Sequence, residues 1–227
     1  MILAAGYATR LYPLTLTKPK PLLTVAGKPM LEYVMDNLAP IEGIDHITIV
    51  TNAKFVTHFE AWAREYLAKP RPFTISVIND GSTDDSNKLG AIGDLALAMQ
   101  REQIDDDLIV VAGDNLFGET LKDFGRVCRE KKAPVLAIYD VGSLEAVKKF
   151  GAVETSPDGQ ITKFEEKPPV PTTTQIGIAL YYYPKSSLAW IHRYLEEKNN
   201  PDQPGRLIQW LHTRTPVYTW LVRGLWY

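Results

Sequence analysis

Short apolar runs alternate with amphipathic stretches through the first half of the chain. Strands are predicted at residues 1–4, 46–51, 73–78 and 108–112, where most side chains are apolar, and helices are predicted at 29–39, 55–66 and 91–101. Strands that alternate with helices predict an α/β fold whose sheet is mostly parallel, Rossmann-like and flanked by helices.

The pattern changes at Pro134, after which short strands follow one another. The predicted strands cover 134–140, 151–155, 161–165, 177–183 and 217–222, a turn at 157–159 joins the second to the third, and helices cover 186–198 and 205–214. We therefore expect a single domain over residues 1–227, in which residues 1–133 form one part and residues 134–227 form a smaller, β-rich subdomain.

Composition and charge exclude several classes of protein. The net charge is −2 and the pI is about 6.1, so no basic field favours nucleic acid or an acidic membrane as a partner. No apolar run approaches the ~18 residues of a membrane span. The single cysteine, Cys128, allows no internal disulfide and fits a helical core position. These features predict a cytoplasmic protein.

The segment after the first strand carries the first candidate chemistry. Small residues at Ala4, Ala5, Gly6 and Ala8 let backbone N–H groups approach an anion closely. Arg10 can grip phosphate oxygens with two N–H groups, and Lys20 adds a point charge. We expect this loop to hold a polyphosphate, rather than to be an ordinary charged surface loop.

Two common phosphate motifs do not fit this segment. A dinucleotide motif, G-x-G-x-x-G, would need glycine where Ala8 and Leu11 stand, and a P-loop would need glycine at Leu22 and Ser or Thr at Pro29. Thr9-Arg10, followed by Lys20 ten residues after the arginine, instead resembles the G-x-G-T-R signature of the sugar-1-phosphate nucleotidyltransferases, with Ala8 in place of the second glycine.

The resemblance assigns a nucleoside triphosphate to the first part of the chain. The residues that would bind the nucleotide are Leu3, Ala4, Ala5, Gly6, Thr9, Arg10, Lys20, Asn79 and Gly90. The last two belong to a polar loop, residues 79–93, which would recognise the base through the backbone of Gly90 and the amide of Asn79. A mobile surface loop is the alternative for this segment.

An aspartate follows the apolar strand at 108–112. The carboxyl end of a parallel strand is where ligands bind in such sheets, and a carboxylate there suits Mg²⁺ that is held together with substrate phosphates. Asp114 therefore is the candidate metal ligand, although aspartate after a strand also commonly caps a turn. The resemblance supports the metal role.

Two further motifs resemble sugar-binding pieces of the same family. Gly151 follows an aromatic residue, Phe150, and would contact sugar hydroxyls through its backbone, while Glu166 and Lys167 would hold the sugar and its phosphate. The family often has an aromatic residue where Ala179 stands, so the sugar pocket is expected to be wider or to be filled by Tyr181 or Tyr183.

The resemblance, closest to the glucose-1-phosphate thymidylyl- and uridylyltransferases, implies nucleotidyl transfer. An NTP, dTTP or UTP by preference, and a sugar 1-phosphate, glucose 1-phosphate by preference, would give an NDP-sugar and pyrophosphate, with Arg10, Lys20 and Asp114 as catalytic residues and Mg²⁺ as cofactor. Two alternatives stay open: cytidylyl transfer to a phosphorylated alcohol such as phosphocholine, and an inactive subunit that senses nucleotide or sugar.

The two ends of the sequence bear on this expectation. The family places a second metal-binding aspartate after an aromatic pair like Trp226-Tyr227, and the sequence stops one residue short of that position. The first strand is also short, so truncation at both ends is expected. Family members commonly self-associate, which makes a homo-oligomer possible, with the aromatic residues near the C-terminus as a candidate contact.

Overall fold

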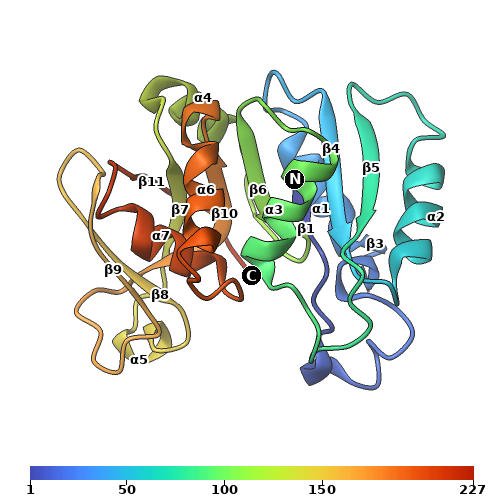
Figure 1. Cartoon of the computed structure of the whole chain (residues 1–227), viewed down its shortest axis with the longest axis horizontal. Helices are drawn as coiled ribbons and strands as arrows, with labels where there is room; N and C mark the ends of the chain where they lie inside the picture. Colours follow the sequence, from blue (N-terminus) through green and yellow to red (C-terminus); the bar gives the residue numbers. More distant parts are fainter.

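The computed structural model describes residues 1–227, and its centre is a nine-stranded mixed sheet (Figure 1). Seven strands follow one another across the sheet in the order β11-β7-β10-β6-β1-β4-β5, and a hairpin of β8 and β9 is attached to β10. The strands are β1 (Ile2–Leu3), β4 (His46–Thr51), β5 (Thr74–Asn79), β6 (Leu108–Ala112), β7 (Val135–Asp140), β8 (Gly151–Thr155), β9 (Ile161–Glu166), β10 (Gln175–Tyr183) and β11 (Tyr218–Leu221).

The directions of the strands decide which strand ends lie at the same edge of the sheet. β1 pairs in parallel with β4 and β6, and β4 pairs in parallel with β5. Because β10 is antiparallel to both β6 and β7, β7 and its parallel neighbour β11 run in the same direction as β1. The carboxyl ends of β1, β4, β5 and β6 therefore meet at one edge, where the predicted phosphate loop and Asp114 begin.

Helices cover both faces of this sheet (Figure 1). The bounds are α1 (Met30–Leu38), α2 (Val56–Tyr66), α3 (Ala91–Arg101), α4 (Lys122–Lys131), α5 (Leu144–Val147), α6 (Leu188–Glu196) and α7 (Pro204–Leu211). The apolar sides of α1, α2 and α4 belong to one buried cluster, and those of α3, α6 and α7 to another. The sheet separates the two clusters, as expected for strands that are buried on both faces.

The structure confirms the predicted fold class and most element positions, and it shows how the strands of the second half join those of the first. β7, β10 and β11 belong to the same sheet as the first half, and β10 lies between β6 and β7. Only the β8–β9 hairpin projects from the sheet, and the predicted turn at its tip is present, with Gly159 at a φ of 82°. The division of the single domain at residue 133 stays a prediction.

Several short elements escaped the sequence pattern. They are α5, the two-stranded sheet of β2 (Thr24–Val25) and β3 (Lys28–Pro29), and 3-10 turns at Thr9–Leu11, Lys20–Leu22 and Lys185–Ser187. Cys128 is buried on α4, as predicted. None of the helices combines the length and apolar character needed to cross a membrane. Near the C-terminus, Trp220 is buried in the core, whereas Tyr227 is 73% exposed.

Candidate active site

The loop after β1 presents a row of backbone N–H groups that have no acceptor within the chain. None of the N–H groups from Gly6 to Arg10 donates to a backbone carbonyl or a side chain. Ala8, in the middle of this row, has left-handed backbone angles, φ 47° and ψ 43°. Successive N–H groups around a left-handed residue form a concave anion site, which is the geometry predicted for this segment. Glycine adopts these angles more readily, which explains the glycine of the related signature.

Hydrogen bonds from side chains at the end of β4 fix the start of this loop. The carbonyl oxygen of Ala4 accepts a hydrogen bond from the hydroxyl of Thr51 at 3.2 Å, and that of Ala5 accepts one from the amide of Asn52 at 2.8 Å. Both donors are buried at the carboxyl end of β4. These contacts fix the start of the loop, so that its N–H groups stay directed toward the open side.

Arg10, Lys20 and Asp114 line one cavity of about 540 Å³ at this edge. The Nζ atom of Lys20 lies 2.5 Å from Oδ2 of Asp114, so the two predicted residues meet across the end of β6. The guanidinium of Arg10 is exposed and forms no ion pair. The other lining residues are Leu3, Ala4, Gly6, Tyr7, Ala8, Thr9, Leu11, Pro21 and Asp85.

The donor set of this cavity fits a metal that is held mainly by its substrate. The chain brings no three acidic, histidine or cysteine side chains together as a metal cluster. Asp114 supplies one carboxylate, and Mg²⁺ in nucleotide enzymes commonly takes one or two carboxylates together with substrate phosphates and water. Asp114 would hold the ion in that manner, with its present partner Lys20 displaced or shared. The backbone of Tyr227 pairs with Leu116, two residues after Asp114.

Asn79 and Gly90 do not line this cavity, and the structure gives each of them a local function. The Oδ1 atom of Asn79 accepts the N–H of Gly81 at 2.8 Å within the turn after β5. A side chain on Gly90 would place its Cβ 2.6 Å from the carbonyl oxygen of Pro201, so this glycine allows the turn at 199–203 to pack on the start of α3. Their binding of a base stays a prediction.

The three predicted sugar-binding residues lie together at the β8–β9 hairpin. Gly151 on β8 pairs with Glu166 on β9, and the N–H of Lys167 donates to the carbonyl of Phe150 at 2.8 Å. Burial raises the pKa of the Glu166 carboxyl, although Lys167 and Arg206 act in the opposite direction. A partly buried acceptor beside two cations is suited to a ligand with hydroxyl groups and a phosphate.

Glycines on two sides leave room for the Glu166 carboxylate. An ideal Cβ on Gly151 would lie 3.1 Å from its Oε2 atom, and one on Gly205, in the first turn of α7, would lie 2.4 Å away. Tyr181 and Tyr183, which were expected to fill the sugar pocket unless that pocket is wider, are both buried in the core. The carbonyl of Ala179 accepts a hydrogen bond from Asn115 at 2.9 Å.

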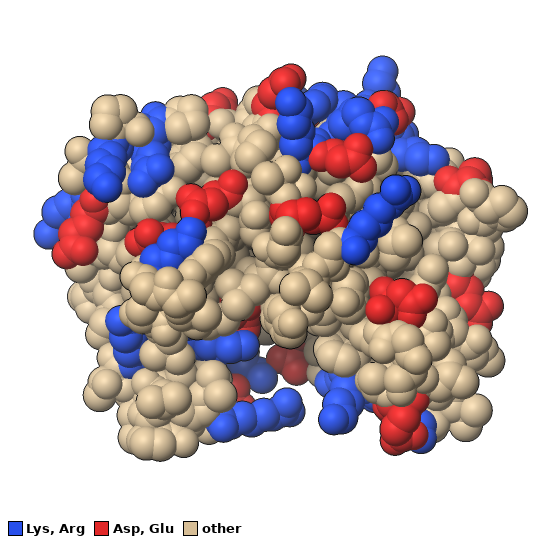
Figure 2. All heavy atoms as spheres, turned by 180° about the vertical axis from the view of Figure 1, so that it is seen from behind, with Lys and Arg blue, Asp and Glu red and all other residues tan.

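The surface between these two groups of residues is hollow. Figure 2 shows a deep hollow at the lower edge of the molecule, between two lobes that both carry Lys and Arg side chains. The lobes correspond to the β8–β9 side and to the phosphate-loop side of Figure 1, which lie at the same edge of the sheet. A ligand with several phosphates would meet positive charge on both sides of this hollow.

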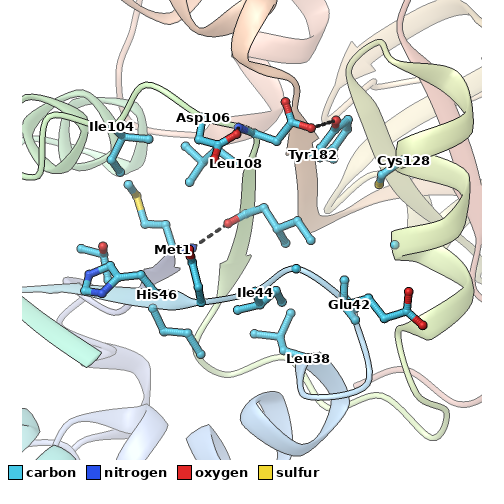
Figure 3. A pocket seen from close by; sticks show the side chains of 18 of the residues that line it. Met1, Leu38, Glu42, Ile44, His46, Ile104, Asp106, Leu108, Cys128 and Tyr182 are labelled. Carbon is cyan, nitrogen blue, oxygen red and sulfur yellow. Dashed lines mark hydrogen bonds between the residues drawn. The ribbon is translucent and has the colours of Figure 1, made fainter. Parts of the chain in front are cut away.

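A second cavity, of about 560 Å³, opens at the opposite edge of the sheet (Figure 3). Met1 lies at its centre, where its amino group donates to the carbonyl of Ile109 at 2.6 Å, and burial lowers the pKa of this amine to about 5. The cavity lies at the amino ends of β4 and β6. Because ligands of such sheets bind at the carboxyl ends of strands, we place the active site in the cavity of Arg10 and Asp114.

Sequence reasoning missed several residues that the structure adds to the site, and four of them bear on its chemistry. Tyr7 and Asp85 line the cavity with Arg10, while Gly205 and Arg206 adjoin Glu166. The dipeptide Pro204-Gly205 contained a signal for one of them, because a glycine in the first turn of a helix commonly marks a close approach. The positions of the other three depend on tertiary contacts that no local pattern records.

Comparison with known proteins agrees with this geometry. Residues 1–227 match the family described as "Nucleotidyl transferase". A UTP–glucose-1-phosphate uridylyltransferase, AglF, of Haloferax volcanii is 28% identical over 183 residues, which are 81% of this chain and 70% of the relative. A putative mannose-1-phosphate guanyltransferase of Sulfolobus acidocaldarius is 31% identical over 193 residues, 83% of this chain and 49% of the relative.

Solved structures show the same fold at lower identity. A UDP-glucose pyrophosphorylase complexed with UDP-glucose superposes with a TM-score of 0.81 at 21% identity, covering 100% of this chain and 93% of the other. A putative glucose-1-phosphate thymidylyltransferase from Bacillus anthracis gives 0.77 at 21% identity, covering 99% and 87%. The chain spans about half the length of most of the curated relatives that it matches, for example 50% of a Synechocystis uridylyltransferase. With a match over its whole length and a site of the expected geometry, the chain belongs to the nucleotidyl transferase family.

Proposed function

We propose that this chain transfers a nucleotidyl group from an NTP to a sugar 1-phosphate, with release of pyrophosphate. The observation that carries this proposal is the single cavity that unites Arg10, Lys20 and Asp114 with the free N–H groups of the phosphate loop. UTP or dTTP with glucose 1-phosphate is the favoured pair, because relatives and structural neighbours with those names match the chain. The guanyltransferase relative makes GTP with mannose 1-phosphate the second pair to test.

The reaction needs positioned charges but no protein nucleophile. An oxygen of the sugar phosphate attacks the α-phosphorus, a new P–O bond forms, and the bond between the α-phosphorus and the oxygen bridging to the β-phosphate breaks, so that pyrophosphate leaves. Arg10 and the loop N–H groups would hold the β- and γ-phosphates and stabilise the charge of the leaving group. Lys20 would reach the α-phosphate. Mg²⁺ at Asp114 would neutralise charge on the phosphates of the NTP.

The β8–β9 hairpin would orient the attacking substrate. Glu166 would accept hydrogen bonds from sugar hydroxyls, Gly151 would contact the sugar through its backbone, and Lys167 would attract the phosphate dianion. Asn79 and Gly90 would face the base. Holding two substrates in line contributes a large part of the rate in such reactions, so the spacing between hairpin and phosphate loop matters as much as any single contact.

Pyrophosphate release with a panel of NTPs and sugar 1-phosphates tests this proposal. The native protein should release pyrophosphate with at least one pair, only with Mg²⁺ present. Arg10→Ala should lower kcat by a factor on the order of 10²–10³, as expected for the loss of a preorganised charge. Lys18→Ala is the matched control, because Lys18 is an exposed cation of the same loop that does not line the cavity. Equal activity of both variants would refute the assignment.

A further inference from the structure

Thr15, which lies between the phosphate loop and the 3-10 turn at Lys20–Leu22, is a buried polar residue in an exposed stretch. It is 0% exposed, whereas residues 9–14 and 16–18 are all exposed. A hydroxyl that leaves water needs an acceptor within the protein, because an unpaired buried hydroxyl is costly. Thr15 finds its acceptor in the carbonyl oxygen of Ala8, to which its Oγ1 donates at 2.8 Å. The chain therefore folds back on itself to bring this one hydroxyl to the phosphate loop.

The carbonyl that Thr15 holds belongs to the strained residue of the phosphate loop. Ala8 has φ 47° and ψ 43°, a left-handed conformation that a residue other than glycine keeps only when its surroundings hold it there. The same oxygen also accepts the N–H of Leu11 at 2.9 Å. Thr15 is the one side chain that hydrogen-bonds the backbone between Gly6 and Arg10. It therefore is the contact outside the local turn that can hold Ala8 in this conformation.

The hydrogen bond from Thr15 also decides where the next N–H group points. In a planar trans peptide the carbonyl and the N–H point in opposite directions, so a carbonyl of Ala8 that faces Thr15 turns the N–H of Thr9 the other way. That N–H has no acceptor in the chain, and Thr9 lines the cavity. At the start of the row of free N–H groups, Asn52 holds the carbonyl of Ala5 in the same manner. The row thus has a side-chain donor behind each end.

We propose that Thr15 is a positioning residue, whose hydroxyl holds Ala8 in the left-handed conformation and so keeps the N–H of Thr9 aimed at the phosphates. The inference rests on the proposed function, because the free N–H groups are assigned there to the β- and γ-phosphates of the NTP. Without the hydroxyl, Ala8 relaxes toward right-handed or extended angles, and the row of N–H groups loses its concave shape. Thr15 does not line the cavity, so its effect reaches the phosphates through Ala8.

Thr15→Val tests this inference, because it keeps the shape of the side chain and removes the donor. The Kd for inorganic pyrophosphate with Mg²⁺, measured by titration calorimetry, should rise about tenfold, in line with the loss of one hydrogen bond. The KM for the NTP should rise by a similar factor, while the KM for the sugar 1-phosphate stays unchanged. Thr15→Ser keeps the donor and should bind like the native protein. Thr17→Val, the same change at an exposed threonine nearby, is the matched control and should also bind normally.

A second substitution separates positioning from a merely structural role. Glycine takes left-handed angles without help, so in an Ala8→Gly background Thr15→Val should raise the Kd for pyrophosphate by only about twofold. This background also keeps the test open if Thr15→Val alone does not fold.

Each outcome decides between the two claims. Native binding by Thr15→Val, or an equal loss in both backgrounds, refutes the positioning role. If pyrophosphate binding follows the expected pattern but no pair of NTP and sugar 1-phosphate reacts, the proposed function fails alone. A native protein that does not bind pyrophosphate refutes both.

Discussion

Replacing Gly205 by alanine should damage sugar binding while it leaves the fold intact. The added Cβ would lie 2.4 Å from Oε2 of Glu166, and ordinary contacts begin at 3.4 Å, so the carboxylate must retreat by about 1 Å (3.4 minus 2.4). The ring of Phe164, at 3.1 Å, needs a much smaller shift. A displacement of this size at a substrate-positioning group can cost about 10²-fold. We expect kcat/KM for the sugar 1-phosphate to fall by about that factor.

The free energy of unfolding of Gly205→Ala should change little, because the group that must move is the end of the flexible Glu166 side chain. Alanine is also favoured over glycine within a helix by up to about 1 kcal/mol, which offsets the remaining strain in α7. The free energy of unfolding should therefore change by less than about 1 kcal/mol. Thermal or denaturant unfolding, measured on the samples used for kinetics, checks this expectation.

A double-mutant cycle tests whether Gly205→Ala acts through the carboxylate of Glu166. If Gly205→Ala acts through the carboxylate, it should have no further effect on the KM for the sugar phosphate in a Glu166→Ala background, and the NTP KM should be unchanged in all variants. Additive effects of the two substitutions would show that the alanine acts elsewhere. An unchanged sugar KM in Gly205→Ala alone would mean that Glu166 does not contact the sugar.

Three further predictions concern other contacts. Lys20→Ala removes the cation that is paired with Asp114, so the Mg²⁺ concentration for half-maximal activity should fall, while kcat falls at least about tenfold. An unchanged Mg²⁺ requirement would contradict the competition between Lys20 and the metal. Burial raises the pKa of Asp94 to about 8 in the folded protein, whereas an unfolded aspartate has a pKa of about 3.9. The free energy of unfolding should therefore fall by up to about 1.4 kcal/mol per pH unit as the pH rises from about 3.9 to about 8. Denaturant titrations of Asp94→Asn should lack this slope. Gly90→Ala should lower the free energy of unfolding by at least about 2 kcal/mol, because Gly90 has φ 81° and ψ 160° and an added Cβ would clash with the backbone of Pro201. Gly81→Ala should lower it less in the same unfolding assay, because Gly81 also has a positive φ but faces open space.

Local patterns predicted the elements well where packing follows the pattern. The helix predicted at 91–101 is present at those residues, and the strand at 108–112 is too, because each buries a regular apolar face in the core. The phosphate loop and Asp114 could also be predicted to share an edge, since both follow parallel strands. Their meeting in one cavity follows from the positions of β1 and β6 as neighbours in the sheet.

Contacts between distant segments could not be predicted in the same way. The pairing of Lys20 with Asp114 depends on how the loop folds back over β6, and the packing of the turn at 199–203 on Gly90 joins segments more than 100 residues apart. The order of strands is likewise absent from local sequence. A 3.6-residue or two-residue period shows that β10 is buried, but not that it inserts between β6 and β7.

The position of β10 limits how this protein can move. A continuous ladder of backbone hydrogen bonds runs from β11 to β5, so the two halves of the chain share one sheet and have no hinge between them. Rotation of one half against the other would break that ladder. Any movement around the cavity must therefore come from segments outside this ladder, such as the loop after β1. The β8–β9 hairpin is itself held by β10 and, at its tip, by hydrogen bonds that join Gly159 and Ile161 to Thr219 and Val217.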